Sequence, residues 1–206
     1  YLKNARQAGQ AIGHFNFATL DVLKAIVEAA KENGAPAVMA GTSEGEADFV
    51  GMGEAVGMVK AVAKDFDFPV FLNSDHFKSF EKCKAAIDAG YDTILIDASQ
   101  LPYEENIALT RQVKDYAMSI DPNIAVEGEI GYLRGSSEVQ QKVEISPADY
   151  TQPEQARDFV TRTRVDRLAV VFGNIHGIVT EQEERLDIEH LKKIVASVSD
   201  VALVLH

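Results

Sequence analysis

Residues 70–97 read VFLNSDHFKSFEKCKAAIDAGYDTILID, and this stretch decides the fold. It opens with an apolar strand candidate at 70–73, continues with a helix-period segment at 79–89, and closes with a β-branched run at 93–96. Ser79 suits the N-cap of the helix, and Gly90 stands where a C-cap glycine would end it. A strand, a helix and a second strand in this order predict a βαβ unit with parallel strands.

The same alternation repeats along the whole chain at a spacing of about thirty residues. The strand candidates are residues 11–15, 35–40, 70–73, 93–96, 124–127, 168–172 and 201–205. The helix candidates are residues 20–33, 53–65, 79–89, 103–119, 153–163 and 188–197. Such repeats suit a doubly wound sheet or a (β/α)8 barrel. The absence of a glycine-rich phosphate fingerprint after the first strand disfavours the dinucleotide-binding version of the doubly wound sheet.

Composition indicates one globular domain over residues 1–206. Of these residues 46% are hydrophobic, and Cys83 is the single cysteine, so no intramolecular disulfide can form. No apolar run reaches the roughly 18 residues of a membrane span, and no signal peptide opens the sequence. We therefore expect a soluble protein of the cytoplasm. The net charge of −12 argues against nucleic-acid and membrane partners, whereas backbone N–H groups can still hold the phosphate of a metabolite.

Three of the five histidines occupy equivalent places in this pattern. His76, His176 and His206 each follow or end a strand candidate, and the carboxyl ends of parallel barrel strands open on one face. Three imidazoles with an open fourth position are typical of catalytic zinc. The alternative is three separate loop or core histidines, and their shared position favours the zinc interpretation. His14 and His190 are interpreted as structural or surface residues.

Carboxylates also gather at the strand ends, and each has two interpretations. Asp75 is either a proton-transferring group beside a metal ligand or a helix N-cap. Glu127 and Glu129 share one strand face. Either one of them contacts a metal or substrate, or Glu127 is the buried partner of a cation elsewhere in the barrel. Asp97 is either an accessory metal ligand or a cap for the turn at Ser99.

Other patterns narrow the chemistry. No lysine lies in or at the end of a strand candidate, so a Schiff-base mechanism has no evident nucleophile. Cys83 is interpreted as a core residue. The polar turn at 41–45 offers hydroxyl and N–H groups to an anion. The long connection at 131–150 is interpreted as a mobile loop over the open face.

Seven motifs, in order from end to end, carry a resemblance to a known family. They are Gly-His-Phe-Asn-Phe at 13–17, Asp-His at 75–76, Ala-Gly-Tyr-Asp-Thr-Ile-Leu-Ile-Asp-Ala-Ser-Gln-Leu-Pro-Tyr-Glu-Glu-Asn at 89–106, Val-Glu-Gly-Glu-Ile-Gly at 126–131, Tyr-Thr-Gln-Pro-Glu at 150–154, Phe-Gly-Asn-Ile-His-Gly at 172–177 and Leu-Val-Leu-His at 203–206. Together they resemble the class II, metal-dependent fructose-bisphosphate and tagatose-bisphosphate aldolases. The chain departs from the family at Asn73 and Ser74, where the family has His and Leu, and in the loop at 134–138.

The resemblance implies an α/β chain of the (β/α)8 TIM-barrel class, seen here only through strand seven. It also implies a zinc aldolase that reversibly cleaves a ketose 1,6-bisphosphate. Fructose 1,6-bisphosphate is the expected substrate, giving dihydroxyacetone phosphate and glyceraldehyde 3-phosphate, as in glycolysis and gluconeogenesis. By the same resemblance, the zinc ligands are His76, His176 and His206, the acid/base residue is Asp75, the second-site ligands for a divalent or monovalent cation are Asp97 and Glu129, and the substrate contacts are Asn16, Ser43 and Gly177. Glu138, with Glu144 behind it, is the candidate loop acid/base.

Three alternatives stay open. They are a tagatose-1,6-bisphosphate aldolase, a non-catalytic sugar-phosphate-binding relative, and a barrel metallohydrolase. The family leads us to expect a homodimer or homotetramer. Because a (β/α)8 barrel typically needs about 250 residues, we also expect a longer chain that adds helix seven, strand eight and helix eight.

Overall fold

The computed structural model describes residues 1–198 and 201–206, which form two compact units. Unit 1 comprises Tyr1–Asp97 and Gln112–Val126, and unit 2 comprises Ala98–Arg111 and Glu127–His206. Helix α6 (Tyr103–Ile120) and strand β5 (Ala125–Ile130) each run from one unit into the other. Within the described residues, no helix has the length and hydropathy needed to cross a membrane.

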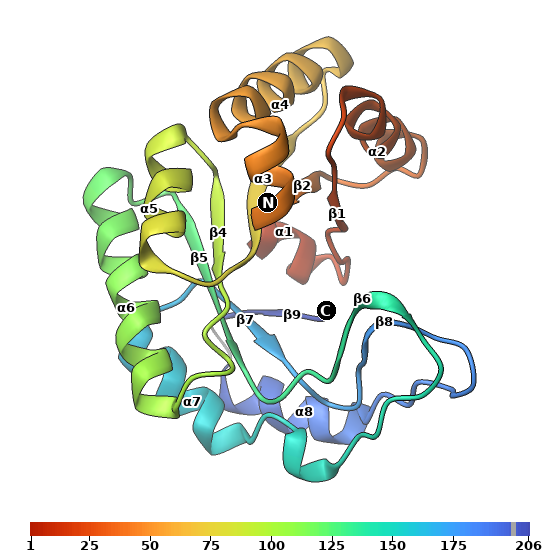
Figure 1. Ribbon diagram of the computed structural model, residues 1–206, viewed down its shortest axis with the longest axis vertical. Coiled ribbons are helices and arrows are strands. Elements are labelled where there is room, and N and C mark those ends of the chain that lie inside the picture. Colours follow the sequence, from red (N-terminus) through yellow and green to blue (C-terminus); the bar gives the residue numbers. More distant parts are fainter. Residues whose placement is uncertain (199–200) are drawn as a thin grey trace. The chain divides into compact units, whose positions relative to one another are not determined.

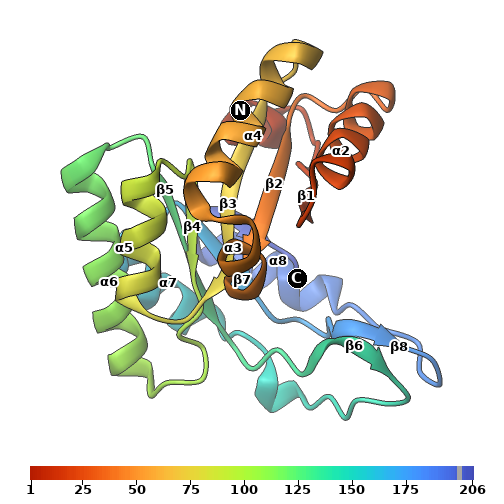
Figure 2. The same cartoon turned by 45° about the horizontal axis from the view of Figure 1, so that its top comes forward.

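Four parallel strands form the sheet of unit 1, in the order β1-β2-β3-β4. They are β1 (His14–Asn16), β2 (Val38–Ser43), β3 (Val70–Phe77) and β4 (Thr93–Ile96). The strands β1, β2 and β3 lie side by side in Figure 2. All four residues of β4 are buried, which is typical of a parallel strand that is covered on both faces.

The helices of unit 1 are α1 (Leu2–Gln7), α2 (Leu20–Glu32), α3 (Glu44–Val50), α4 (Met52–Phe66) and α5 (Phe80–Ala89). Helices α2 and α4 pack against each other (Figure 1). Helix α5 begins where the Ser79 hydroxyl accepts the N–H of Lys82, and it ends at Gly90, whose φ of 100° is left-handed. Its buried side chains include Cys83, which confirms the core interpretation of that residue.

Unit 2 contains a second set of parallel strands with two helices. Strand β7 (Arg167–Val170) pairs with β5 on one side and with β9 (Ala202–Val204) on the other. Helices α7 (Pro153–Thr163) and α8 (Ile188–Ser197) pack against each other. Pro153 lies at the first turn of α7, where its missing N–H is one of those that have no intrahelical partner at a helix start.

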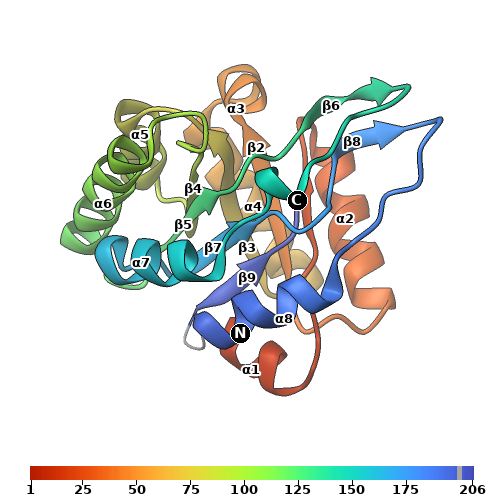
Figure 3. The same ribbon diagram turned by 90° about the horizontal axis from the view of Figure 1, so that it is seen from below.

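The segment between β5 and α7 is more structured than a long loop. It contains β6 (Gly135–Gln140), which pairs in parallel with β8 (His176–Val179), and a 3-10 turn, η1 (Pro147–Asp149). Figure 3 shows this β6–β8 ribbon extending away from α7 and α8. The interpretation of residues 131–150 as connection without a strand was wrong, because the pairing partner of β6 lies some forty positions further along the chain.

The predicted strands and helices are all present, with shifts at their ends. The bounds of β4, α7 and α8 agree with prediction to the residue. The sequence interpretation missed α1, α3, β6 and β8. The polar turn expected at 41–45 is in fact the end of β2 and the start of α3.

Candidate active site

A β-bulge shapes the carboxyl end of β3. Between Ser74 and Phe77 the strand advances three residues while β4 advances only two. His76 has a left-handed φ of 51°, which is uncommon for a residue with a side chain. The Ser74 hydroxyl accepts the N–H of Leu95 at 3.1 Å and so fixes the strand just before the bulge. Bulges beside functional sites redirect side chains, and this one sets the directions of Asp75 and His76.

The Asp75 carboxylate is held by an amide. Asn16 Nδ2 donates to Asp75 Oδ2 at 2.8 Å, joining β1 to β3 across the intervening strand β2. Asp75 also lies in register with Ser43 of β2. The N-cap interpretation of Asp75 was wrong, because Ser79 is the N-cap of α5, the helix that follows Asp75. Ser43 is the N-cap of α3, and its hydroxyl accepts the N–H of Glu46.

His76 is paired with a carboxylate. His76 Nδ1 lies 3.0 Å from Asp97 Oδ2, and the two side chains are 17% and 12% exposed. Asp75, His76 and Asp97 can all offer metal ligands, and the available atoms of His76 lie within 4.8 Å of each carboxylate. A histidine whose one ring nitrogen is held by a carboxylate directs its other nitrogen, here Nε2, toward a metal.

A second polar cluster in unit 1 was missed by the sequence interpretation. Asn73 Nδ2 donates to His14 Nε2 at 3.3 Å, and Thr93 Oγ1 donates to Asn73 Oδ1 at 2.5 Å. Gly41 makes room for this cluster, because a Cβ there would lie 2.1 Å from His14 Nε2 and 2.5 Å from Asn16 Oδ1. One signal for this cluster was available in the sequence. His14 lies two residues before Asn16, so the two side chains share one face of β1.

In unit 2, the Glu127 carboxylate contacts two basic side chains, those of Arg167 and His206. Its Oε2 lies 3.1 Å from Arg167 Nη1, and its Oε1 lies 3.0 Å from His206 Nε2. The three side chains are 2%, 3% and 11% exposed for Glu127, Arg167 and His206. The expectation that Glu127 is the buried partner of a cation is confirmed, and the cation is Arg167.

His206 also lines a cavity of about 440 Å³ together with Gly177. The other lining residues are Ile175, Val179, Glu184 and Leu205. Glu184 Oε1 accepts the N–H of Ile175 at 2.7 Å, and Asn174 Nδ2 donates to the His206 carbonyl at 3.1 Å. Two of the predicted site residues, His206 and Gly177, therefore share one cavity.

The other predicted residues of unit 2 lie on β5 and on the β6–β8 ribbon. His176 begins β8 and is half-buried, with its N–H donated to the Arg134 carbonyl at 2.9 Å. Glu129 is buried on β5 at 2% exposure, and Asn106 donates to its backbone carbonyl. Glu138 is exposed on β6.

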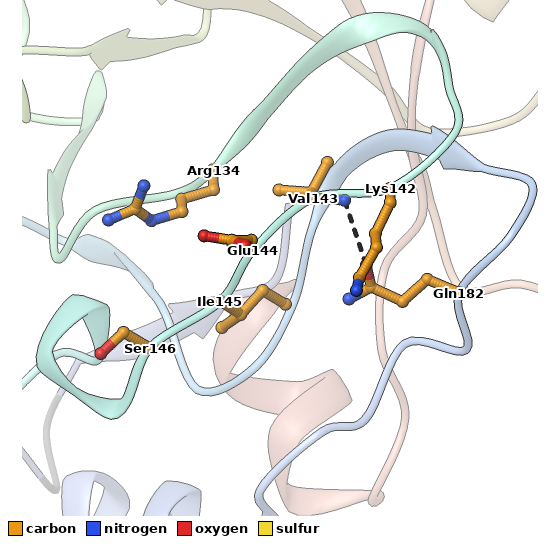
Figure 4. Close-up of a pocket in the computed structure, with 7 residues that line it drawn as sticks. All are labelled: Arg134, Lys142, Val143, Glu144, Ile145, Ser146 and Gln182. Carbon is orange, nitrogen blue, oxygen red and sulfur yellow. Dashed lines mark hydrogen bonds between the residues drawn. The ribbon is translucent and has the colours of Figure 1, made fainter.

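A second cavity, of about 420 Å³, is lined mainly by residues of the segment between β5 and α7. Figure 4 shows Lys142 alongside Gln182, whose Oε1 accepts the N–H of Val143. The exposed Glu144 also lines it. Arg134, at its edge, donates from Nε and Nη2 to Asp149 at 2.8 and 2.9 Å. These bonds lower the pKa of the Asp149 carboxyl below its ordinary value.

Comparison with known proteins places this geometry in a family. A sequence model described as fructose-bisphosphate aldolase class-II matches residues 1–206. The chain belongs to the class II fructose-bisphosphate aldolase family. A fructose-bisphosphate aldolase of Staphylococcus epidermidis is 37% identical over 208 residues, covering 100% of this chain and 70% of the relative. The crystal structure of the YdjI aldolase of Escherichia coli K12 matches with a TM-score of 0.84 and 32% identity, over 100% of this chain and 70% of its own.

Family membership settles two expectations. The protein is a class II aldolase and therefore a lyase. Its α/β fold of parallel strands and helices is consistent with part of a (β/α)8 barrel, as the structural likeness to the YdjI aldolase confirms.

The residues present fit a metal of the kind on which class II aldolases generally depend. His76 and His206 each have one ring nitrogen within hydrogen-bond distance of a carboxylate oxygen, at 3.0 Å in both cases. This is the usual environment of a metal-ligating imidazole, because the carboxylate fixes the orientation of the ring and the lone pair of the other nitrogen binds the metal.

Proposed function

We propose that this class II aldolase reversibly cleaves fructose 1,6-bisphosphate into dihydroxyacetone phosphate and glyceraldehyde 3-phosphate with a bound Zn²⁺. His76, His176 and His206 would hold the zinc. The observation that carries the proposal is the Asp75–His76 pair at the bulge of β3, with the first held by Asn16 and the second by Asp97. Names and family of the relatives support the substrate.

Bound zinc would supply Lewis-acid polarisation of the ketose carbonyl. Three imidazole nitrogens suit zinc, which prefers nitrogen and sulfur donors in a tetrahedral arrangement and keeps an open position when catalytic. Asp97 and Glu129 are proposed to serve a second divalent or monovalent cation. In this assignment Asp97 both orients His76 and offers a carboxylate oxygen.

Asp75 is proposed to accept the proton of the C4 hydroxyl as the C3–C4 bond breaks. Its Oδ2 accepts the Asn16 amide at 2.8 Å, which restricts rotation of the carboxylate and leaves Oδ1 to take the proton. A positioned general base of this kind contributes roughly 10²–10⁴-fold to the rate. Asn16 is thus proposed to contribute to the substrate site by orienting the Asp75 carboxylate.

The remaining assignments complete the substrate site. Ser43 and Gly177 are proposed to contact the phosphate and the dihydroxyacetone phosphate end of the substrate. Gly177 lies in the same cavity as His206, and its φ of 90° turns the backbone there. Glu138 is proposed to exchange the proton on the carbon next to the carbonyl, since its exposed position on β6 leaves it accessible to a ligand.

The test is a coupled cleavage assay on the purified protein with fructose and tagatose 1,6-bisphosphates, paired with metal analysis. We expect cleavage of the fructose ester, loss of activity in EDTA, recovery with Zn²⁺, and a roughly 10²–10⁴-fold fall in kcat in Asp75→Asn. Asp88→Asn is the matched control, because that side chain is 42% exposed on α5 and such surface ion pairs contribute little. Cleavage that survives EDTA, or full activity in Asp75→Asn, would overturn the proposal.

A further inference from the structure

Three neighbouring strands of unit 2, β5, β7 and β9, bring together three side chains that form one buried hydrogen-bond network. Glu127 of β5 lies in register with Arg167 of β7, and Arg167 lies in register with Ala202 of β9, four residues before His206. The two carboxylate oxygens of Glu127 serve different partners. Oε2 faces the Arg167 guanidinium at 3.1 Å, and Oε1 faces His206 Nε2 at 3.0 Å.

The chemistry of these groups fixes the tautomer of His206. An ionised carboxylate can only accept hydrogen bonds, and the adjacent guanidinium, which can only donate, balances its charge. The hydrogen bond between Glu127 and His206 therefore requires the proton of the neutral imidazole on Nε2. In that tautomer the lone pair lies on Nδ1, so Nδ1 is the nitrogen that would bind a metal.

We propose that Glu127 and Arg167 are positioning residues that set the tautomer and ring direction of His206, and so determine how tightly that histidine binds zinc. This inference rests on the proposed role of His206 as a metal ligand. Arg167 acts indirectly. It fixes which carboxylate oxygen of Glu127 faces the guanidinium, and so which oxygen faces His206. His206 lines the 440 Å³ cavity, whereas Glu127 and Arg167 are almost fully buried, so the pair acts on the metal through the imidazole.

Replacing Glu127 by Gln separates geometry from charge, because the amide has nearly the same shape. Its oxygen will face Arg167, since two donors would otherwise oppose each other there. Its NH₂ group must then face His206 Nε2, and a donor in that place requires the lone pair on Nε2 and the proton on Nδ1. Glu127→Gln is therefore expected to invert the tautomer. In the double variant Glu127→Gln/Arg167→Met the amide is free to turn, its oxygen can accept from Nε2–H, and the original tautomer returns.

The experiment measures the tautomer and the metal separately. Nitrogen-15 NMR of the metal-free protein gives the protonated nitrogen of His206, and chelator competition gives the dissociation constant for Zn²⁺. We expect Nε2–H in the wild type and Nδ1–H in Glu127→Gln, with zinc bound roughly 10- to 100-fold more weakly. The double variant should recover most of this affinity. His190 is the internal control, because its Nε2 lies 2.8 Å from the Thr151 carbonyl oxygen and its tautomer should not change.

Each outcome has one meaning. Nδ1–H in the metal-free wild type overturns the inference without any variant, so a Glu127→Gln protein that fails to fold does not remove the test. An unchanged tautomer and affinity in Glu127→Gln, or a loss that Arg167→Met leaves untouched, also overturns it. Failure of the wild type to bind zinc overturns the proposed function, and the tautomer of His206 still decides whether Glu127 positions the ring.

Discussion

Gly128 lies beside the proposed positioning residue Glu127, and we predict that Gly128→Ala destabilises the protein. Gly128 lies between Glu127 and Glu129 on β5. A Cβ there would lie 2.7 Å from Phe159 Cε1, 3.0 Å from its Cζ and 3.1 Å from Thr110 Cγ2. The Phe159 and Thr110 side chains are completely buried, so the ring on α7 can relieve the clash only by displacing its neighbours.

The magnitude follows from the cost of overpacking. Adding a methyl group to a well-packed core costs about 1–3 kcal/mol in the free energy of unfolding. For a chain of 150–250 residues each kcal/mol lowers Tm by roughly 2–4 °C, so the expected fall is roughly 2–12 °C. Differential scanning calorimetry or thermal circular dichroism measures it. Gly57→Ala is the matched control, because Gly57 lies in the interior of α4 with no atom within 4 Å of a Cβ. That variant should gain about 0.5–1 kcal/mol.

A double-mutant cycle tests the cause. Phe159→Leu removes the atoms that approach Gly128, so we expect it to cost less in the Gly128→Ala background than in the wild type. A coupling energy of about 0.5 kcal/mol or more between the two sites would show that they share one contact. Additive effects, or an unchanged Tm in Gly128→Ala, would refute the packing argument.

Three further predictions concern single groups. Asn16→Ala, which frees the Asp75 carboxylate, should lower kcat/KM roughly 10- to 100-fold with zinc content unchanged, and an unaltered kcat/KM would contradict the positioning role. Burial raises the pKa of the Cys83 thiol from 9.0 to about 12, so its contribution to stability is complete below pH 9 and is lost as pH rises toward 12; rapid iodoacetamide labelling of the native protein at pH 8 would show the assignment to be wrong. Arg134 lowers the pKa of Asp149 below 3.8, so the stabilisation of residues 131–150 is complete above that pH and disappears as pH falls through the lowered value. Hydrogen exchange of this segment should accelerate in acid in the wild type and be less dependent on pH in Asp149→Asn, and equal profiles would argue against the Arg134–Asp149 pair.

The predictable parts of the fold are the elements whose signals lie within their own residues. Strand β4 and helix α7 were predicted to the residue, because an apolar run and a proline-initiated helix mark their own ends. Helix α3 was missed although its signal was present. Ser43 and Glu46 form a capping box, with the serine accepting the N–H of residue 46 and the glutamate accepting that of residue 43.

Strands β6 and β8 had no such local signal. Their pairing joins Gly135 to His176 across the whole of α7 and β7, and it depends on the path of the backbone between them. The segment is rich in polar residues and lacks an alternating pattern, so its strand character arises from tertiary pairing. A strand of this kind cannot be derived from period or composition.

The candidate site divides in the same way. The chemical types and the strand-end positions of Asp75, His76 and His206 were predictable, because a parallel sheet places such residues at one edge. Their partners were not. The contact of His76 with Asp97 depends on a one-residue bulge, and that of His206 with Glu127 depends on the register of two strands that are not neighbours. Glu127 had two open interpretations, and only the position of Arg167 decides between them.

Strand β5 explains why this part of the chain tolerates little change. Alternation places Glu127 and Glu129 on one face and Gly128 on the other. On the glycine face the Phe159 ring lies too close for any side chain, and on the opposite face Glu127 needs both carboxylate oxygens, one for Arg167 and one for His206. A larger residue at 128 would move the backbone that carries both carboxylates, so core packing on one face controls the hydrogen-bond geometry on the other. We therefore expect the contact of Phe159 of α7 with Gly128 of β5 to act on His206 through Glu127.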